Sequence, residues 1–267
     1  MTLNICLAGA TGWAGAELAR GIGGADDLLL TSGVSRTHAG RSLGEVLDDD
    51  RLMMVPLHAS ATAALEAPCD VFVEYTAATL AKANVLAALH KGAHVVVGTS
   101  GLTDADYAEI DDVARQHGRG VLACGNFAIT AVLLLKCAEL VAGQLRQWEI
   151  VEYASDAKAD VPSGTVRELA RRLAGIRRPE MTVPISQTLG PPEARGADME
   201  GIRVHSVRLP GHTLGVDVVF GMADQTLVLR HNAGSSARPY VDGALLAIRK
   251  VPALVGLHRG LDSVMDL

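Results

Sequence analysis

The residue types best suited to chemistry gather in residues 152–165, with the sequence EYASDAKADVPSGT. Lys158 brings a mobile positive charge and a proton that it can give to a reacting group. Ser163-Gly164-Thr165 leads into VRELARRLA, a helical pattern, so Ser163 or a neighbour is predicted to cap a helix. Free N–H groups at a helix start, together with two hydroxyls, can bind a carboxylate. The segment therefore predicts binding and protonation of a small carboxylate; a capped helix after a polar turn is the alternative.

A glycine-rich turn stands near the N-terminus, after a predicted strand over Leu3–Ala8 and before the helical pattern AELARGI. Its three glycines have the spacing GxxGxxG. Glycines so placed permit a tight turn, close approach of a pyrophosphate and close packing of the helix. The turn is predicted to bind a dinucleotide, and a glycine-rich turn without a ligand is the alternative. The predicted cofactor-binding residues of the turn are Gly9, Thr11, Gly12, Trp13, Ala14 and Gly15.

The end of the second predicted strand, Leu28–Val34, bears on which cofactor is bound. Folds that prefer NADH usually carry an acid about 20 residues after the glycine turn, which holds the ribose hydroxyls. Here Ser35 and Arg36 stand at that place, with His38 close by. A hydroxyl, a guanidinium and an imidazole suit a 2′-phosphate. We therefore expect NADPH in preference to NADH, although Arg36 could instead be a solvated surface charge.

Strands alternate with helices along the first half of the chain, which predicts an α/β fold with a doubly wound parallel sheet. Further strands are predicted over residues 71–76, 94–97 and 120–124, with helices over 80–90 and after a capping box at Thr103. Ligands of such sheets bind beyond the carboxyl ends of the strands. The residues at those ends, predicted to line the nicotinamide pocket, are Thr76, Gly98, Thr99, Asn126 and Phe127.

The pattern changes after a predicted helix over residues 129–141. Longer alternating strands are expected over 148–153, 202–207, 215–220 and 226–231, which predicts a second lobe with an open mixed sheet. Residues 40–68 and 176–200 read as irregular. A closing helix begins near Pro239.

Composition restricts the classes of partner. The net charge of −6 makes a nucleic-acid partner unexpected. The four cysteines have no metal-ligand spacing, so no metal is expected and the thiols are predicted to be reduced. The N-terminus lacks the features of a signal peptide, and no apolar run has membrane-spanning length. A cytoplasmic protein without a membrane partner is expected.

Several segments together resemble the dihydrodipicolinate reductase family, the bacterial 4-hydroxy-tetrahydrodipicolinate reductases of diaminopimelate and lysine synthesis. The matching segments keep their order over nearly the whole chain: GATGWAGAEL, VVVGTSGLTDADYAEI, ACGNFAITAVLLL, KADVPSGT, RGADMEGIRVHSVRLPG, LVLRHNAG and the C-terminal Asp266-Leu267. In this family a nicotinamide cofactor gives hydride to a cyclic, imine-like dicarboxylate. The resemblance implies that Lys158 protonates the substrate or binds its carboxylate, and that Gly164 and Thr165 grip the other carboxylate.

The resemblance also implies a domain division and an assembly. Residues 1–127 and 238–267 would form a dinucleotide-binding Rossmann domain from both chain ends. Residues 128–237 would form an inserted domain that binds substrate and builds a homotetramer.

One departure from the family pattern lies between Glu152 and Lys158. Two family histidines are replaced by Ala154 and Ser155, and an acid, Asp156, follows. Alanine offers no side-chain hydrogen bond, and serine carries no charge at neutral pH. We therefore expect an NAD(P)H-dependent reductase that acts on an imine or conjugated C=C of a carboxylate other than the usual family substrate.

Two alternatives remain from the sequence. The family reaction could persist at a lower rate, since loss of one general acid costs roughly 10² to 10⁴. A non-catalytic dinucleotide-binding protein is the other alternative. His212, in a predicted loop, could also take the place of a missing histidine.

Overall fold

The computed structural model describes residues 2–267, which form two compact units. Unit 1 comprises residues 1–129 and 237–267, and unit 2 comprises residues 130–236. The predicted boundaries at 127/128 and 237/238 differ from these by only a few residues. The functions predicted for the two domains stay predictions at this point.

Unit 1 is built on a parallel sheet of seven strands in the order β12-β6-β5-β4-β1-β2-β3. Its central strands are continuous apolar runs because both faces of the sheet are covered. This confirms the predicted doubly wound α/β fold. The strands are β1 (Leu3–Ala8), β2 (Leu28–Val34), β3 (Leu57–His58), β4 (Val71–Glu74), β5 (His94–Val97), β6 (Gly120–Ala123) and β12 (Gly256–Arg259).

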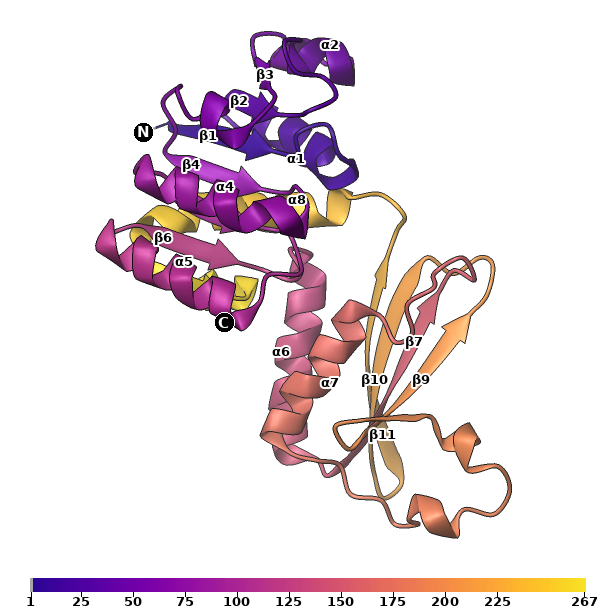
Figure 1. Ribbon diagram of the computed structural model, residues 1–267. Coiled ribbons are helices and arrows are strands. Elements are labelled where there is room, and N and C mark those ends of the chain that lie inside the picture. The colour runs from indigo at the N-terminus through magenta and orange to yellow at the C-terminus, as the bar shows by residue number, and fades with distance from the viewer. Residues whose placement is uncertain (1) are drawn as a thin grey trace. The chain divides into compact units, whose positions relative to one another are not determined.

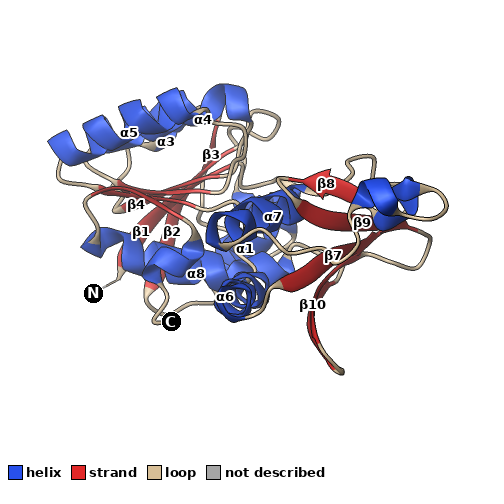
Figure 2. Cartoon of the chain, turned by 90° about the horizontal axis from the view of Figure 1, so that it is seen from below, coloured by secondary structure: helices blue, strands red, loops and turns tan. Residues whose placement is uncertain are grey.

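Helices cover both faces of this sheet (Figure 2). On one face lie α1 (Trp13–Gly23) and α8 (Val241–Lys250), and on the other lie α3 (Ala61–Ala64), α4 (Ala78–His90) and α5 (Asp104–Gln116). The closing helix α8 therefore belongs to the same unit as the N-terminal strands. The predicted capping box of α5 is confirmed, since the Thr103 hydroxyl accepts from the Asp106 N–H and the Asp106 carboxylate accepts from the Thr103 N–H.

The prediction that residues 40–68 are irregular is wrong in part. This segment holds β3, α3, α2 (Leu43–Leu47) and a 3₁₀ turn over Asp50–Leu52. Strand β12, beside β6 at the edge of the sheet, was also not predicted. Elements of two to five residues are too short to show a helical or strand period, so pattern reasoning misses them.

Unit 2 contains a mixed sheet of five strands in the order β11-β10-β7-β9-β8 (Figure 1). Strands β7 and β9 are parallel, and the other neighbours are antiparallel. The prediction of a mixed sheet in the second lobe is confirmed. The strands are β7 (Gln147–Ala154), β8 (Ala197–Met199), β9 (Ile202–Arg208), β10 (Leu214–Met222) and β11 (Gln225–Ala233).

Two helices, α6 (Ile129–Gln144) and α7 (Gly164–Ile176), contribute to the core of unit 2. Buried residues of α7 such as Leu169 and Leu173 pack with Ile150 of β7 and Phe220 of β10. Strand β7 alternates buried and less buried positions, with residues 148, 150, 152 and 154 on the buried side. Residues 152 and 154 thus face the helices, whereas 151 and 153 lie on the opposite face of the sheet.

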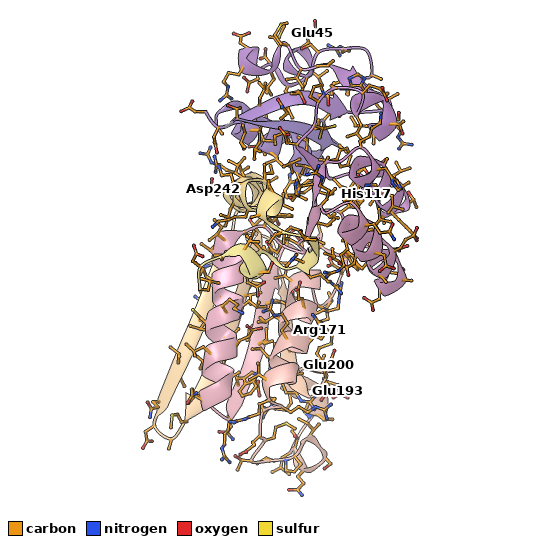
Figure 3. All side chains as sticks on the ribbon, turned by 90° about the vertical axis from the view of Figure 1, so that its left-hand side faces the viewer. Glu45, His117, Arg171, Glu193, Glu200 and Asp242 are labelled. Carbon is orange, nitrogen blue, oxygen red and sulfur yellow. The ribbon has the colours of Figure 1, made fainter. Side chains whose placement is uncertain are left out.

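The outer surfaces carry charged side chains, for example Glu45 on α2, Arg171 on α7 and Asp242 on α8 (Figure 3). Among residues 2–267, no helix combines the length and the hydropathy that crossing a membrane requires.

Candidate active site

The glycine turn of unit 1 is a tight backbone cradle between β1 and α1. Gly9 has a φ of +80°, and a Cβ there would overlap the Tyr75 carbonyl oxygen. A Cβ on Gly15 would overlap the Gly9 carbonyl oxygen. Gly12 begins α1 without a side-chain cap, so no protein side chain competes for the N–H groups of the first turn. These residues fit the pyrophosphate of a dinucleotide, whose negative charge the helix start attracts.

A cavity of about 530 Å³ adjoins this turn. Polar groups from two strand ends meet on its wall, where the Thr11 and Ser35 hydroxyls lie 2.8 Å apart. Arg36 is exposed at the rim, and no acid is among the lining residues, all of which belong to the described chain. Five of the predicted cofactor residues therefore share one cavity: Gly9, Thr11, Ser35, Arg36 and Thr76.

The predicted nicotinamide residues gather around the ends of β4 and β5. The Thr99 hydroxyl donates to the Glu74 carboxylate at 3.2 Å, and the Thr76 N–H donates to the same oxygen at 2.6 Å. A Cβ on Gly98 would overlap the Tyr75 ring, so Gly98 lets this ring lie against the strand end.

Three other predicted cofactor residues, Phe127, Asn126 and Trp13, do not line the 530 Å³ cavity. Phe127 is buried, with its ring 5.8 Å from that of Tyr75, and therefore supports the pocket wall from within the core. The Asn126 side chain accepts from the Ala128 N–H at 2.8 Å and shapes the turn after β6. Trp13 is exposed, with its ring 5.9 Å from that of Tyr240.

In unit 2 the predicted cap is confirmed: the Ser163 hydroxyl accepts from the Val166 N–H at 3.3 Å, and α7 begins at Gly164. Behind this cap lies Glu152, which is fully buried. Its two carboxylate oxygens accept from the Ser163 N–H at 3.2 and 3.0 Å. The same carboxylate accepts from the Ser206 hydroxyl at 2.7 Å and from Arg208 Nη2 at 2.6 Å. A single carboxylate thus ties β7, β9 and the start of α7 together.

Arg208 extends this connection to the loop that carries Lys158. Its Nη2 also donates to the Asp160 carbonyl oxygen at 2.8 Å. The part of the loop that follows Lys158 is therefore held at two points, by Arg208 at Asp160 and by Glu152 at Ser163. The sequence interpretation missed Glu152, Ser206 and Arg208 as site-building residues. The available signal was an acid on the apolar side of an alternating strand.

Hydrogen bonding decides the charge of Glu152. Burial alone raises the pKa of this carboxyl, but donors from Ser206, Arg208 and Ser163 outweigh burial, and the pKa lies below its ordinary value. The group is thus an anion paired with Arg208 at neutral pH.

Lys158 lies 2.7 Å from the Asp160 carboxylate and remains about one-third exposed. The Lys158 ammonium beside Asp160 holds the pKa of that carboxyl below its ordinary value. The neighbouring Ser155 hydroxyl donates to Asp156 at 3.2 Å and accepts from the Ala157 N–H at 3.2 Å. Ala154 is fully buried. Neither replaced histidine position therefore offers a new free functional group.

His212 does not join this group. Its ring lies 5.3 Å from that of Tyr153, which is on the face of β7 opposite to Glu152. The hypothesis that His212 replaces a family histidine is therefore not supported.

A larger cavity of about 750 Å³ in unit 2 is lined by none of the predicted site residues. Its wall includes Glu149 and Val151, which point away from Glu152 on β7. We do not count it as part of the candidate site. Within residues 2–267, no group of three or more His, Cys, Asp or Glu side chains is arranged to hold a metal ion.

A doubly wound sheet whose first strand turns through three close-packed glycines into a helix is the architecture of dinucleotide-dependent dehydrogenases and reductases. The chain is an NAD(P)H-dependent oxidoreductase. The model for the N-terminus of dihydrodipicolinate reductase matches residues 3–127, and the model for its C-terminus matches residues 129–265. The chain belongs to the dihydrodipicolinate reductase family.

Relatives and solved structures agree with this assignment. The chain is 34% identical over 266 residues to the 4-hydroxy-tetrahydrodipicolinate reductase of Oceanobacillus iheyensis, covering 99% of this chain and 100% of the relative. The enzyme of that name from Mycolicibacterium vanbaalenii is also 34% identical, with the same coverage. The dipicolinate-bound dihydrodipicolinate reductase from Paenisporosarcina sp. TG-14 superposes with a TM-score of 0.89 at 27% identity, over 99% of this chain and 100% of that chain. An amine dehydrogenase from Mycobacterium smegmatis, at 15% identity and a TM-score of 0.68 over 97% of this chain and 95% of that one, shares the fold.

Gly15→Ala tests the backbone cradle. Because the added methyl group would overlap the Gly9 carbonyl, we expect NADPH to bind at least about tenfold more weakly, as measured by fluorescence titration. Gly143→Ala is the matched control, since no heavy atom lies within 4 Å of a Cβ there and the glycine is helical. It should leave binding unchanged and stabilise the protein by roughly 0.5–1 kcal/mol. Equal binding by the two variants would contradict the role of the cradle.

Glu152→Gln tests the buried pair through pH. A depressed folded-state pKa means that the carboxylate stabilises the fold above its unfolded pKa of about 4.3, and that this contribution is lost as pH falls through the lower folded-state pKa. We expect the variant to lose about 1–3 kcal/mol of unfolding free energy at pH 7, because the largely buried Arg208 loses its charged partner and keeps only carbonyl acceptors. The difference should shrink below about pH 4. Urea unfolding across pH measures it, with Glu149→Gln, a half-exposed position on the same strand, as control; a pH-independent difference contradicts the assignment.

Proposed function

We propose that the protein is a 4-hydroxy-tetrahydrodipicolinate reductase, which transfers hydride from NADPH, or less efficiently NADH, to an unsaturated cyclic dicarboxylate. The observation that carries this proposal is that Glu152 binds the N-cap of α7 directly and, through Arg208, the loop that carries Lys158. Such an arrangement suits a small dianion. Full-length relatives that bear this enzyme name, and a neighbour solved with dipicolinate, support it.

In this proposal the residues of unit 1 hold the cofactor. The turn with Gly9, Gly12 and Gly15 binds the pyrophosphate, and Ser35 with Arg36 binds the 2′-phosphate of NADPH. Thr76, Gly98, Thr99, Asn126 and Phe127 form the surroundings of the nicotinamide ring. When bound, the cofactor supplies the hydride.

The residues of unit 2 hold the substrate. The N–H groups of Gly164 and Thr165, aided by the Thr165 hydroxyl, bind one carboxylate at the positive end of α7. Lys158 binds the second carboxylate or gives a proton to the reduced ring. Before substrate binds, the Lys158 ammonium pairs with Asp160.

The expectation of a substrate other than the family's is not supported. The two full-length relatives named above, from Oceanobacillus iheyensis and Mycolicibacterium vanbaalenii, both bear the name 4-hydroxy-tetrahydrodipicolinate reductase. The physical reason lies in the two replaced histidines. Ala154 is buried and the Ser155 hydroxyl is already used in its own turn, so neither position can recognise a different substrate. Their loss removes a proton donor without adding a contact, and a lower turnover number is the expected consequence.

Arg36→Ala tests the cofactor preference. Loss of the guanidinium removes a charge-assisted contact to the 2′-phosphate, so we expect the KM for NADPH to rise roughly tenfold or more while the KM for NADH stays constant. Initial rates with both cofactors measure this. Arg41→Ala is the control, because Arg41 is exposed, pairs with Glu45 and does not line the cavity. Equal changes for the two cofactors would contradict a phosphate-binding role.

Lys158→Ala tests the substrate assignment. We expect kcat/KM for the cyclic dicarboxylate to fall by about 10²-fold or more, with the Kd for NADPH unchanged. Lys91→Ala, an exposed lysine paired with Glu66 in unit 1, should be neutral. The assay follows NADPH oxidation at 340 nm with enzymatically generated substrate, and a bacterial strain lacking this reductase should grow when it expresses the wild-type gene. Absence of both turnover and growth, with reduction of another imine or enoate carboxylate, would overturn the proposal.

We also propose that the protein is a homotetramer assembled through unit 2. Edge strand β11 exposes Leu227 and Val228, which an assembly would cover. Light scattering on the purified protein measures the mass directly.

A further inference from the structure

A second buried carboxylate, that of Glu74, lies in unit 1 at the carboxyl end of β4. Its Oε1 accepts from the Thr76 N–H at 2.6 Å, from the Thr99 hydroxyl at 3.2 Å and from the Thr76 hydroxyl. Its Oε2 accepts from the Asn84 side-chain amide at 2.8 Å. None of the ion pairs found within residues 2–267 includes Glu74. The charge is thus surrounded by neutral donors alone.

Both oxygens of the Glu74 carboxyl group accept hydrogen bonds. A backbone N–H and an amide NH₂ can only donate, and here they bind different oxygens of the same carboxyl. A carboxyl buried without a cation is costly to the fold unless its hydrogen bonds are complete. A glutamine at this position could accept some of the same hydrogen bonds without carrying a charge. We therefore ask what a negative charge at this position would do.

The position of Glu74 connects this charge to the cofactor. Thr76 and Asn84, two of its partners, line the 530 Å³ cavity beside the glycine turn. Thr99, the third, is one of the residues that we assign to the nicotinamide surroundings. The carboxylate therefore lies directly behind the wall of the proposed cofactor site.

We infer that Glu74 is a positioning residue for the cofactor, and that its uncompensated negative charge favours the oxidised nicotinamide over the reduced one. This inference rests on the proposed cofactor site. The ring of NADPH is neutral, and it becomes positively charged once hydride, a proton with two electrons, has left for the substrate. A buried anion behind the pocket wall stabilises that positive charge because few water molecules screen it.

Coulomb's law sets the size of the effect. At an effective dielectric constant of about 20–40, a unit charge about 10 Å away changes a binding constant by roughly four- to seventeenfold. The effect applies to NADP⁺ and not to NADPH. It is therefore separable from any general loosening of the pocket, which weakens both.

Glu74→Gln is the test, because the side chain keeps its shape and loses its charge. The amide of Asn84 can turn to present its oxygen to the new NH₂, and the two threonine hydroxyls can still donate to the remaining oxygen. We expect the ratio Kd(NADP⁺)/Kd(NADPH), measured by calorimetry on the full-length protein without dicarboxylate, to rise about four- to seventeenfold. Glu74→Asp, which keeps the charge, should leave this ratio within about twofold of wild type.

Two results overturn the inference: an unchanged ratio in Glu74→Gln, or equal weakening of both cofactor forms. If Glu74→Gln does not fold, as judged by circular dichroism, Asn84→Lys neutralises the carboxylate by an ion pair and must raise the ratio in the same direction. Failure of the inference is distinguishable from failure of the proposed function. In the second case wild-type protein binds neither cofactor form, or binds both without reducing the cyclic dicarboxylate.

Discussion

The structure of the proposed substrate-binding region depends on one interaction, the contact of the buried Glu152 carboxylate with Arg208 and the Ser163 N–H. Three segments that are distant in sequence meet there: the end of β7, the end of β9 and the start of α7. Arg208 also donates to the Asp160 carbonyl oxygen. The loop that carries Lys158 is therefore attached to the same carboxylate–guanidinium pair as the start of α7. The ion pair is retained for geometry, since a buried pair contributes little net stability compared with an apolar substitute.

Unit 1 uses a related arrangement with a different electrostatic result. Glu74 also ends a central strand and also gathers donors from loops that carry site residues. Glu152 has a guanidinium partner, so its charge is cancelled locally, whereas Glu74 has only neutral donors. The first arrangement suits a site for a dianion, where a further free negative charge would repel the ligand. The second suits a site where positive charge develops during the reaction.

Ala154 and Ser155 stand where we expected two family histidines, while the other features of the family are kept. The fold, the glycine cradle and the clamped lysine loop are all present, and the relatives align over their full length. Ala154 is packed in the core and the Ser155 hydroxyl is bonded within its own turn, so neither residue disturbs the contacts of Glu152.

The amino-acid sequence by itself determined the features that depend on neighbouring residues. These are the glycine turn after β1, the capping box of α5, the cap at Ser163 and the alternation of apolar runs that makes a parallel sheet, because propensity, capping and periodicity act over a few residues. Only the tertiary structure decided the features that need contacts between residues distant in the sequence. Glu152 and Arg208 are 56 residues apart, and the short strands β3 and β12 form by pairing with β2 and β6, which are distant in the sequence. The burial of the Glu74 and Glu152 side chains likewise arises only when the chain is packed.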